Sequence, residues 1–279
     1  MTVDWEKLEV GGDGLQLARR ESHTDGNSRK CWVVELGMIG YADAGLLQKR
    51  LVAARKANAV GDVLLLCEHP PVITLGRNGK REHLLASEHV LAQKGVQFHA
   101  TDRGGDVTFH GPGQVVGYPI IDLAEIRRDT AWYVRMLEEV MIRATAEFGV
   151  AAIREAGKSG IWVSANTAAA TSARADAAAP EKLGAIGVHL SRWVTSHGFA
   201  YNVSTDLRYF DLIVPCGIAA RKATSLEKLL NRAVHAGEAA PRLIRHFGEV
   251  FGLEMQHASR TQLLAALETF EQQPVAASA

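Results

Sequence analysis

The sequence predicts an α/β (α+β) fold in which a mixed β-sheet is flanked by helices. Strand-like runs outnumber helical runs in the middle of the 279-residue chain, and helical segments flank and follow them. This order is not the regular strand–helix alternation of a doubly wound sheet, so we expect a mixed sheet with helices on one side. With 47% hydrophobic residues, the chain is long enough to bury an ample core.

The first half of the chain is predicted to form strands around one long helix. Residues 31–37 (CWVVELG) form an apolar run that is typical of a strand. Leu47, Leu51 and Ala54 recur at helical spacing, which predicts a helix over residues 41–60. Further strands are expected at residues 62–69, 70–76, 107–110 and 114–123, with a short helix within residues 81–95.

The second half is predicted to be richer in helices. Residues 130–149 form the clearest one, because apolar residues such as Tyr133 fall on one face. Thr224 and Glu227 have the spacing of a capping box, and Pro241 is expected at the first position of the following helix. Strands are predicted at residues 160–164 and, as a pair separated by a turn, within residues 183–204; helices are predicted at residues 224–230, 241–252 and 260–272.

The predicted domain organisation is simple. Residues 1–30 are polar and irregular and are interpreted as an N-terminal extension, and residues 31–273 as a single domain. Residues 165–180 hold nine alanines but no apolar stripe that could be buried, so we expect a mobile surface insertion there.

Composition excludes several classes of protein. The 31 basic and 31 acidic residues give a net charge of zero, and nucleic-acid binders usually have a strong basic excess, so no nucleic acid is expected as a partner. Apolar runs such as residues 63–67 are far shorter than the roughly 20 residues of a membrane-spanning helix. The first residues have no apolar signal region. We therefore expect a cytoplasmic protein without membrane contact.

The three cysteines are widely spaced and include no CxxC pair, so neither a disulfide framework nor a metal site is expected. Cys31 and Cys67 lie in apolar strand-like runs and are predicted to be buried. Cys216 stands between Pro215 and Gly217, and turn residues of this kind predict a loop, where functional groups are often presented.

A cysteine nucleophile must be a thiolate, and the usual thiol pKa of about 8.5 leaves only a few per cent ionised at neutral pH. A neighbouring cation would increase that fraction. The sequence leaves open which cation this is: Lys182, Arg192, Arg221 or Lys222. His110 and His197, each beside a glycine, are candidate bases, although such histidines are as often structural.

Glycines surround the short strand in residues 103–123 (RGGDVTFHGPGQVVGYPIIDL). Glycine lets backbone N–H groups approach a phosphate or an oxyanion closely, but the segment matches neither GxGxxG nor the P-loop pattern. Small residues in LGAIG (183–187) and HGFA (197–200) leave room for a slender acyl chain, or alternatively for close strand packing.

Four segments in this order resemble the lipoyl(octanoyl) transferases: EHPPVITLGR (68–77), residues 103–123, KLGAIGVHLSRWVTSHGFAYNV (182–203) and FDLIVPCGI (210–218). The resemblance implies a catalytic domain with a biotin/lipoate protein ligase-like core. It also implies transfer of an octanoyl group from octanoyl-acyl carrier protein to a lysine of a lipoyl domain. The implied acceptors are the lipoyl domains of 2-oxoacid dehydrogenase E2 subunits and the glycine cleavage H protein, and no cofactor is implied.

The resemblance also implies residue roles. Cys216 would hold the octanoyl thioester, and Lys182 would lower the pKa of Cys216 and later accept a proton from the incoming lysine. Phe109 stands where tyrosine is frequent and Gly184 where alanine is usual, and the alanine-rich run before Lys182 is longer than typical. The implied substrate-binding residues are Arg103, Gly104, Gly105, Asp106, Val107, Thr108, Phe109, His110, Ala185, Ile186, Gly187, Gly198, Phe199 and Ala200.

Three other functions compete with this one. An ATP-dependent lipoate or biotin ligase would share the fold, but the sequence contains no recognisable adenylate motif. A non-catalytic binder of acylated carrier proteins would not need both Cys216 and Lys182, and a cysteine hydrolase would use His110 or His197. Arg77, Lys80 and Arg81 form a small basic cluster that either steers an acidic carrier protein or is a solvated loop.

Overall fold

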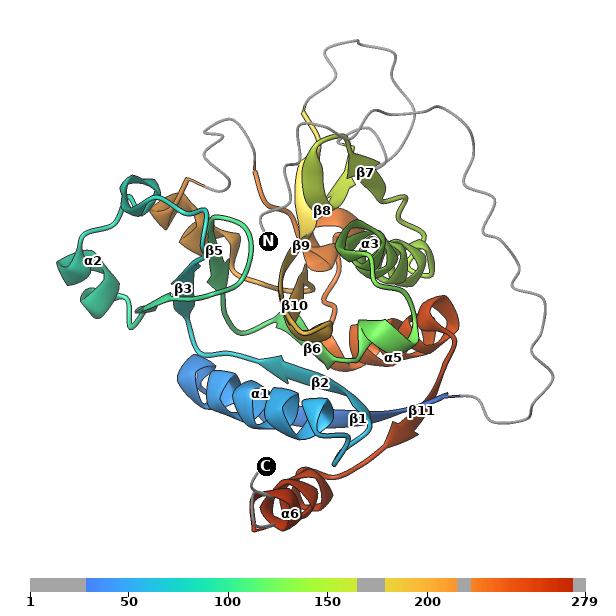
Figure 1. Ribbon diagram of the computed structural model, residues 1–279. Coiled ribbons are helices and arrows are strands. Elements are labelled where there is room, and N and C mark those ends of the chain that lie inside the picture. The colour runs from blue at the N-terminus through green and yellow to red at the C-terminus, as the bar shows by residue number, and fades with distance from the viewer. Residues whose placement is uncertain (1–28, 165–178, 215–221, 273–279) are drawn as a thin grey trace.

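The structure is a computed structural model that describes residues 29–164, 179–214 and 222–272 (Figure 1). Its centre is an eight-stranded sheet with the order β11-β1-β2-β6-β10-β9-β8-β7. β1 pairs in parallel with β11 and β2, and the other neighbours are antiparallel, so the sheet is mixed as predicted. The strands are β1 (Arg29–Met38), β2 (Asp62–Glu68), β6 (Gln114–Ile120), β7 (Ile153–Glu155), β8 (Lys158–Val163), β9 (Glu181–Ser191), β10 (Val194–Asn202) and β11 (Leu253–His257).

A second sheet of three strands, in the order β4-β3-β5, lies beside the first. Its strands are β3 (Val72–Leu75), β4 (Gln97–Ala100) and β5 (Val107–His110). It packs with the short helix α2 (Glu88–Gln93) and the 3-10 helix at Leu207–Leu212 around a small core of its own that includes Phe109. The predicted helix within residues 81–95 is therefore α2, preceded by a 3-10 turn at Arg81–His83.

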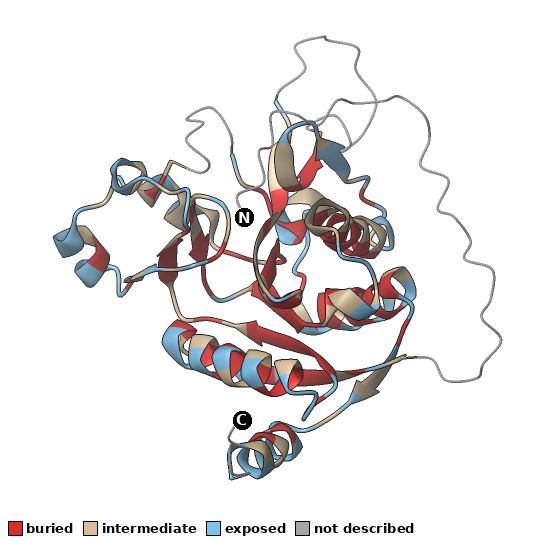
Figure 2. Ribbon diagram, viewed as in Figure 1, coloured by how far each residue is buried: buried red, intermediate tan, exposed pale blue. Residues whose placement is uncertain are grey.

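Helices cover both faces of the large sheet, so the expected covering of one side is wrong. Along β2, Leu64 and Leu66 belong to the core cluster under α3 and α5, whereas Leu65 and Cys67 belong to the cluster under α1 and α6. Successive side chains of a strand point to opposite faces, and a strand buried on both faces is a continuous apolar run. Figure 2 shows these central strands as buried. The helices are α1 (Tyr41–Lys56), α3 (Thr130–Ala146), α4 (Leu226–Leu230), α5 (Ala236–Phe251) and α6 (Arg260–Glu271).

Two predicted helix starts are wrong. The N-cap of α4 is Ser225, whose side chain accepts a hydrogen bond from the Lys228 N–H, and Thr224 is buried. α5 begins five residues before Pro241, which therefore lies inside the helix. Proline costs least in the first turn of a helix, so the sequence favoured a start at residue 241, but tertiary packing extends the helix toward its N-terminus.

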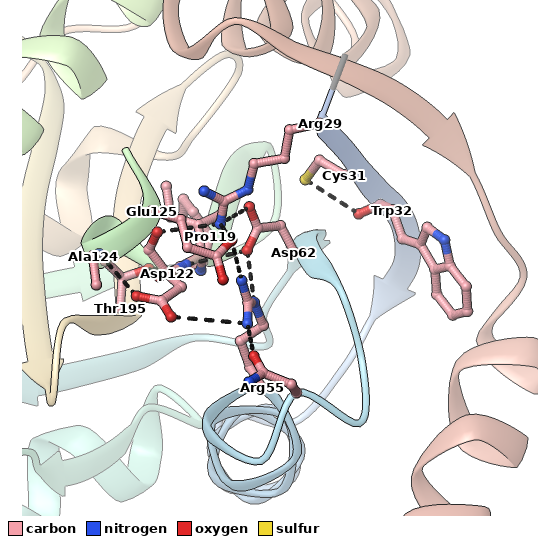
Figure 3. Close-up of polar contacts among 12 residues, drawn as sticks. Arg29, Cys31, Trp32, Arg55, Asp62, Pro119, Asp122, Ala124, Glu125 and Thr195 are labelled. Carbon is pink, nitrogen blue, oxygen red and sulfur yellow. Dashed lines mark hydrogen bonds and ion pairs between the residues drawn. The ribbon is translucent and has the colours of Figure 1, made fainter. Parts of the chain in front are cut away.

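A cluster of charged side chains lies at one end of the large sheet (Figure 3). The side chain of Asp62, at the start of β2, has no exposed surface; it accepts a hydrogen bond from Arg55 Nε at 2.9 Å and pairs with Arg29 Nη2 at 2.5 Å. Asp62 also accepts the Asp122 backbone N–H at 3.1 Å, and Arg55 reaches Glu125 at 3.0 Å. The cluster thus ties β1, β2, α1 and the end of β6 together.

The predicted N-terminal extension lies almost wholly outside the described residues, because β1 begins at Arg29. Residues 165–178 of the predicted alanine-rich insertion, and Cys216, also lie outside them. In the described ranges, no helix combines the length and the apolar character needed to cross a membrane.

Candidate active site

A largely apolar cavity opens between the two sheets. The empty space in it, including its open mouth, is about 1030 Å³. Its walls come from β5, β6, β8, β9 and β10, with Tyr41 of α1 and Phe210 of the 3-10 helix. The residues that line it are Tyr41, Arg103, Gly105, Asp106, Val107, Thr108, His110, Gln114, Val116, Tyr118, Ser159, Trp162, Lys182, Ala185, Ile186, Gly187, His197, Gly198, Phe199, Ala200, Asn202, Phe210, Lys222 and Ala223.

Most of the substrate-binding residues implied by the sequence meet in this cavity. The two exceptions are Gly104 and Phe109. The Phe109 ring lies in the small core, where it stacks on Tyr209 with 4.7 Å between ring centroids. Gly104 lines a neighbouring cleft, and its N–H donates to Val188 O at 2.9 Å.

The two segments of small residues, 183–187 and 197–200, are cross-strand partners. On the β9–β10 hairpin, Ala185 faces Ala200, Ile186 faces Phe199 and Gly187 faces Gly198. A Cβ on Gly198 would lie 2.1 Å from Gly117 O, so only glycine fits there. These glycines let the strands approach closely, and the same stretch forms one wall of the cavity.

Arg103 stabilises the shape of the loop at residues 103–106, here called the glycine loop. Its guanidinium is buried and donates to Thr74 O at 2.8 Å, to Asp106 O at 2.7 Å and to Gly104 O at 3.0 Å. Gly105 has a φ of +87°, which favours glycine, and its carbonyl lies 2.3 Å from the position that a Cβ on Gly76 would take. The glycines therefore serve a folded loop that packs tightly against the end of β3.

Lys182 lies near the start of β9, and its Nζ stands 4.8 Å from the centroid of the Trp162 ring. Its backbone N–H donates to Lys222 O at 2.8 Å, and its carbonyl accepts from the Thr224 N–H at 2.9 Å. Lys222 is the first described residue after residues 215–221, the segment that contains Cys216. The chain that leaves that segment is thus anchored directly on Lys182.

Gly160 of β8 makes room for this lysine. It has a φ of +105°, and a Cβ there would meet Gly184 O at 2.3 Å and Lys182 Cε at 3.1 Å. Its N–H donates to Glu138 Oε1 at 3.0 Å. Any side chain at this position would collide with the apolar stem of Lys182. The glycine at position 160 therefore helps to set the position of the Lys182 ammonium.

A chain of hydrogen bonds runs from His110 toward Lys182. Gln114 uses its two amide hydrogens on Phe109 O and Asn202 Oδ1, so its Oε1 must accept and His110 Nδ1 donates at 2.7 Å. Asn202 in turn donates to Thr224 O at 3.0 Å. Burial, with the nearby charges of His69 and Arg103, lowers the pKa of His110 to about 3, so His110 is neutral and a poor proton acceptor near pH 7.

A second buried histidine lies behind the first. His69 Nδ1 donates to Ile39 O at 2.8 Å, so His69 Nε2 accepts from the Tyr118 hydroxyl at 2.7 Å. Burial raises the pKa of Tyr118 well above its usual value, which keeps the hydroxyl protonated as the donor. Tyr41 stacks against His110 with 6.0 Å between ring centroids.

His197 is paired with a carboxylate. Its Nε2 lies 2.8 Å from Asp102 Oδ1, and its backbone has a φ of +54°. Burial lowers the pKa of His197 although Asp102 opposes that shift, and despite its own partial burial Asp102 has a lowered pKa because His197 and His189 stabilise the carboxylate. Neutral His197 therefore donates Nε2–H to Asp102, and in the described structure its buried Nδ1 has no hydrogen-bond partner.

Sequence reasoning missed several lining residues. Gln114 and Tyr118 belong to a motif that was singled out, so their polar groups next to the glycine loop were an available signal. Asn202 likewise lies in the singled-out segment 182–203, whereas Tyr41 and Trp162 come from other elements, and only the packing of those elements brings them to the cavity. Among the residues described, no group of three or more potential metal ligands was found.

Comparison with known proteins agrees with this geometry. Residues 41–248 match the family described as the lipoyl protein ligase A/B catalytic domain. An octanoyltransferase of Solibacter usitatus is 49% identical over 227 residues, covering 81% of this chain and 96% of that protein. An octanoyltransferase of Chloroflexus aurantiacus is 48% identical over 220 residues, covering 78% and 93%.

Solved structures share the fold at low identity. A putative lipoate protein ligase of Thermoplasma acidophilum with bound lipoic acid has a TM-score of 0.64 at 14% identity and covers 87% of this chain and 95% of its own. A lipoate-protein ligase A bound with ATP has a TM-score of 0.61 at 14% identity, covering 88% and 96%. The fold class and the family resemblance expected from the sequence are confirmed, and the chain belongs to the lipoyl protein ligase A/B catalytic-domain family and is an acyltransferase.

Proposed function

We propose that this protein transfers an octanoyl group from octanoyl-acyl carrier protein to a specific lysine of a lipoyl domain, through a thioester on Cys216. The observation that carries the proposal is the largely apolar cavity that Lys182 lines. Two octanoyltransferases are 49% and 48% identical to this chain, and the match covers 96% and 93% of their own length. Lipoyl domains of 2-oxoacid dehydrogenases and the glycine cleavage H protein are the proposed acceptors, and the cytoplasm is the proposed location.

In the first step of the proposed reaction, the Cys216 thiolate attacks the carbonyl carbon of the donor thioester. The bond from that carbon to the carrier sulfur breaks, and the carrier leaves as a thiol after taking a proton from the Lys182 ammonium, which becomes neutral. The Lys182 ammonium stabilises the attacking thiolate. The anchoring of residues 222–224 on the Lys182 backbone supports this pairing, because it connects the end of the Cys216 segment to the lysine.

In the second step, the amine of the acceptor lysine attacks the Cys216 thioester. An amide bond forms, the carbon–sulfur bond breaks, and Lys182 in its neutral form accepts the proton that the amine loses. Conversion of a thioester to an amide is downhill, so no nucleotide is consumed. His110 acts as a neutral hydrogen-bonding wall group rather than as the base, because its conjugate acid is too strong.

The proposal is tested by mixing octanoyl-acyl carrier protein, a lipoyl domain and the enzyme without nucleotide, and by following both proteins by intact-mass spectrometry. We expect octanoylated lipoyl domain, and with the acceptor omitted, one octanoyl group on the enzyme. Cys216→Ala should abolish both products. Cys31→Ala is the matched control and should keep them, because Cys31 is buried and burial raises the pKa of its thiol.

Lys182→Met keeps the apolar stem of the side chain and removes the ammonium. It should lower the rate of transfer by about 10²–10⁴-fold, the usual contribution of general acid–base catalysis, without changing the melting temperature. Modification of the acceptor only when ATP and free octanoate are supplied, with ATP–pyrophosphate exchange, would instead establish an ATP-dependent ligase.

A further inference from the structure

A second cleft adjoins the apolar cavity of the candidate active site, which is called the acyl cavity from here on. The proposed reaction gives this second cleft no role. Its empty space, including the open mouth, is about 1270 Å³. It shares Gly105, Ser159, Ile186 and Gly187 with the acyl cavity, so the two hollows lie next to each other. The residues that line both hollows form the wall between them.

Two arginines at this cleft have no side-chain partner among the residues that the structure describes. Within the described ranges, the guanidinium groups of Arg77 and Arg192 make no ion pair or hydrogen bond, whereas the neighbouring Arg81 pairs with Glu88 at 3.0 Å and Lys80 with Glu82 at 3.5 Å. Both arginines are exposed. Of the three basic residues that the sequence singled out near position 80, Arg77 is thus the one whose side chain has no ion pair with another described residue.

Positive charge is concentrated around Arg192. The pKa of Lys56 is lowered, first by its burial and then by the charge of Arg192, so the two cations repel each other. The acidic side chain that lines the cleft, Asp102, accepts a hydrogen bond from His197 and lies 3.8 Å from His189. An anion bound beside Arg192 would relieve this repulsion.

The backbone presents Arg192 in a demanding conformation. Arg192 and Trp193 form the β9–β10 turn, with φ values of +52° and +68°. Such two-residue turns favour Asn-Gly or Gly-Gly, and left-handed backbone costs about 1–2 kcal/mol for an ordinary residue. Arg192 and Trp193 thus place large side chains at the cleft in a backbone conformation that is unfavourable for them.

The rest of the lining is both apolar and polar. Val134, Leu190 and Trp193 supply apolar surface, while Asn78 and Thr130 supply groups that form hydrogen bonds with amides. Arg77 is attached to the glycine loop, because its N–H donates to Arg103 O at 2.9 Å. The cleft therefore fits a slender chain that contains amides and ends in a phosphate.

We propose that this cleft binds the 4′-phosphopantetheine arm of the acyl donor, with Arg77 and Arg192 holding its phosphate and its thioester end reaching the adjoining acyl cavity. The inference rests on the proposed function, because the donor is taken to be an acylated carrier protein. Guanidinium groups suit phosphate oxygens in charge and in planar geometry.

The test compares two small donors that differ only in the phosphate, octanoyl-4′-phosphopantetheine and octanoyl-pantetheine, with a lipoyl domain as acceptor. In the wild-type enzyme, we expect kcat/KM to be about tenfold higher for the phosphorylated donor, which is near the lower end for a hydrogen bond to a charged group. Arg77→Gln and Arg192→Gln should each reduce this ratio toward one. Arg260→Gln, which removes an exposed arginine at the start of α6, is the matched control and should keep it.

Calorimetric titration with 4′-phosphopantetheine and with pantetheine, neither of which carries an acyl group, separates this inference from the proposed function. Binding that needs the phosphate and is weakened by Arg77→Gln and Arg192→Gln supports the subsite even when no octanoyl group is transferred. Equal binding of the two compounds, equal kcat/KM for the two donors, or a phosphate preference that survives both substitutions would overturn it. Displacement of 4′-phosphopantetheine by ATP together with pyrophosphate exchange would assign the cleft to a nucleotide instead.

Discussion

The contact between Gly117 and Phe199 gives the sharpest test of how the cavity wall is built. Phe199 of β10 lies directly opposite Gly117 of β6, and its ring is 2% exposed. A Cβ on Gly117 would lie 2.2 Å from Phe199 Cζ and 2.4 Å from Cε1. Ordinary contact begins at 3.4 Å, so in Gly117→Ala the ring must withdraw by about 1.2 Å. The ring occupies the space that any side chain at position 117 would need.

We expect Gly117→Ala to destabilise the protein by about 1–3 kcal/mol, the usual cost of overpacking a core. This corresponds to a melting temperature lower by about 2–4 °C for each kcal/mol in a domain of this size. Because Phe199 also lines the cavity, kcat/KM for octanoyl transfer should fall as well. Urea unfolding and the transfer assay measure the two effects on the same preparations.

A double-mutant cycle tests the cause. Phe199→Leu removes the ring atoms that collide with the new methyl group, so Gly117→Ala should cost much less stability in that background. Gly45→Ala is the matched control, because no atom lies within 4 Å of the position its Cβ would take. An equal loss of stability for Gly117→Ala in the wild-type and Phe199→Leu backgrounds would refute the steric explanation.

Two further predictions concern buried ionisable groups. Asp62→Asn should lower the free energy of unfolding by about 3–5 kcal/mol in urea titrations, because it leaves Arg29 and Arg55 beside an uncharged partner. Glu271→Gln, in an exposed pair with Arg50, should have no measurable effect. Equal effects of the two substitutions would contradict this explanation. The pKa of His110 falls from 6.5 to about 3 on folding, so the unfolded chain binds the extra proton and stability is lost as the pH falls below 6.5. This group alone lowers the free energy of unfolding by about 2 kcal/mol at pH 5. His110→Asn keeps a donor for Gln114, so this variant should lose less stability than the wild type between pH 8 and pH 5, as measured by urea titrations at both pH values. An equal loss of stability in the variant and the wild type would contradict the assignment.

Much of the fold could be predicted because its signals are local. The apolar run of β2 and the one-sided helix α3 were recognised at close to their observed positions. The short strands β4, β7 and β11 were missed, since three to five residues carry too little pattern to stand out. The covering of both faces was also missed, although the uninterrupted burial of β2 is the sign of it.

The candidate site was predictable to the extent that it lies in contiguous motifs. The cross-strand pairing of residues 185–187 with residues 198–200 follows from a hairpin with a two-residue turn, and both segments were expected to contact the acyl chain. Phe109 was placed in the substrate site with its neighbours, but along β5 it points into the small core. A one-residue step along a strand reverses the direction of a side chain, and a motif read as a block misses that reversal.

The sequence by itself predicted the mixed sheet and the glycine loop before β5, and its resemblance to the lipoyl(octanoyl) transferases pointed to Lys182 and Cys216, whose roles remain proposals. Only the tertiary structure decided that Tyr41 and Trp162 join the cavity, that His110 is neutral, and that Arg77 and Arg192 share a cleft beside it. The physical reason is that periodicity and turn preferences act over a few residues, whereas desolvation and the sharing of a cavity depend on which distant elements pack together.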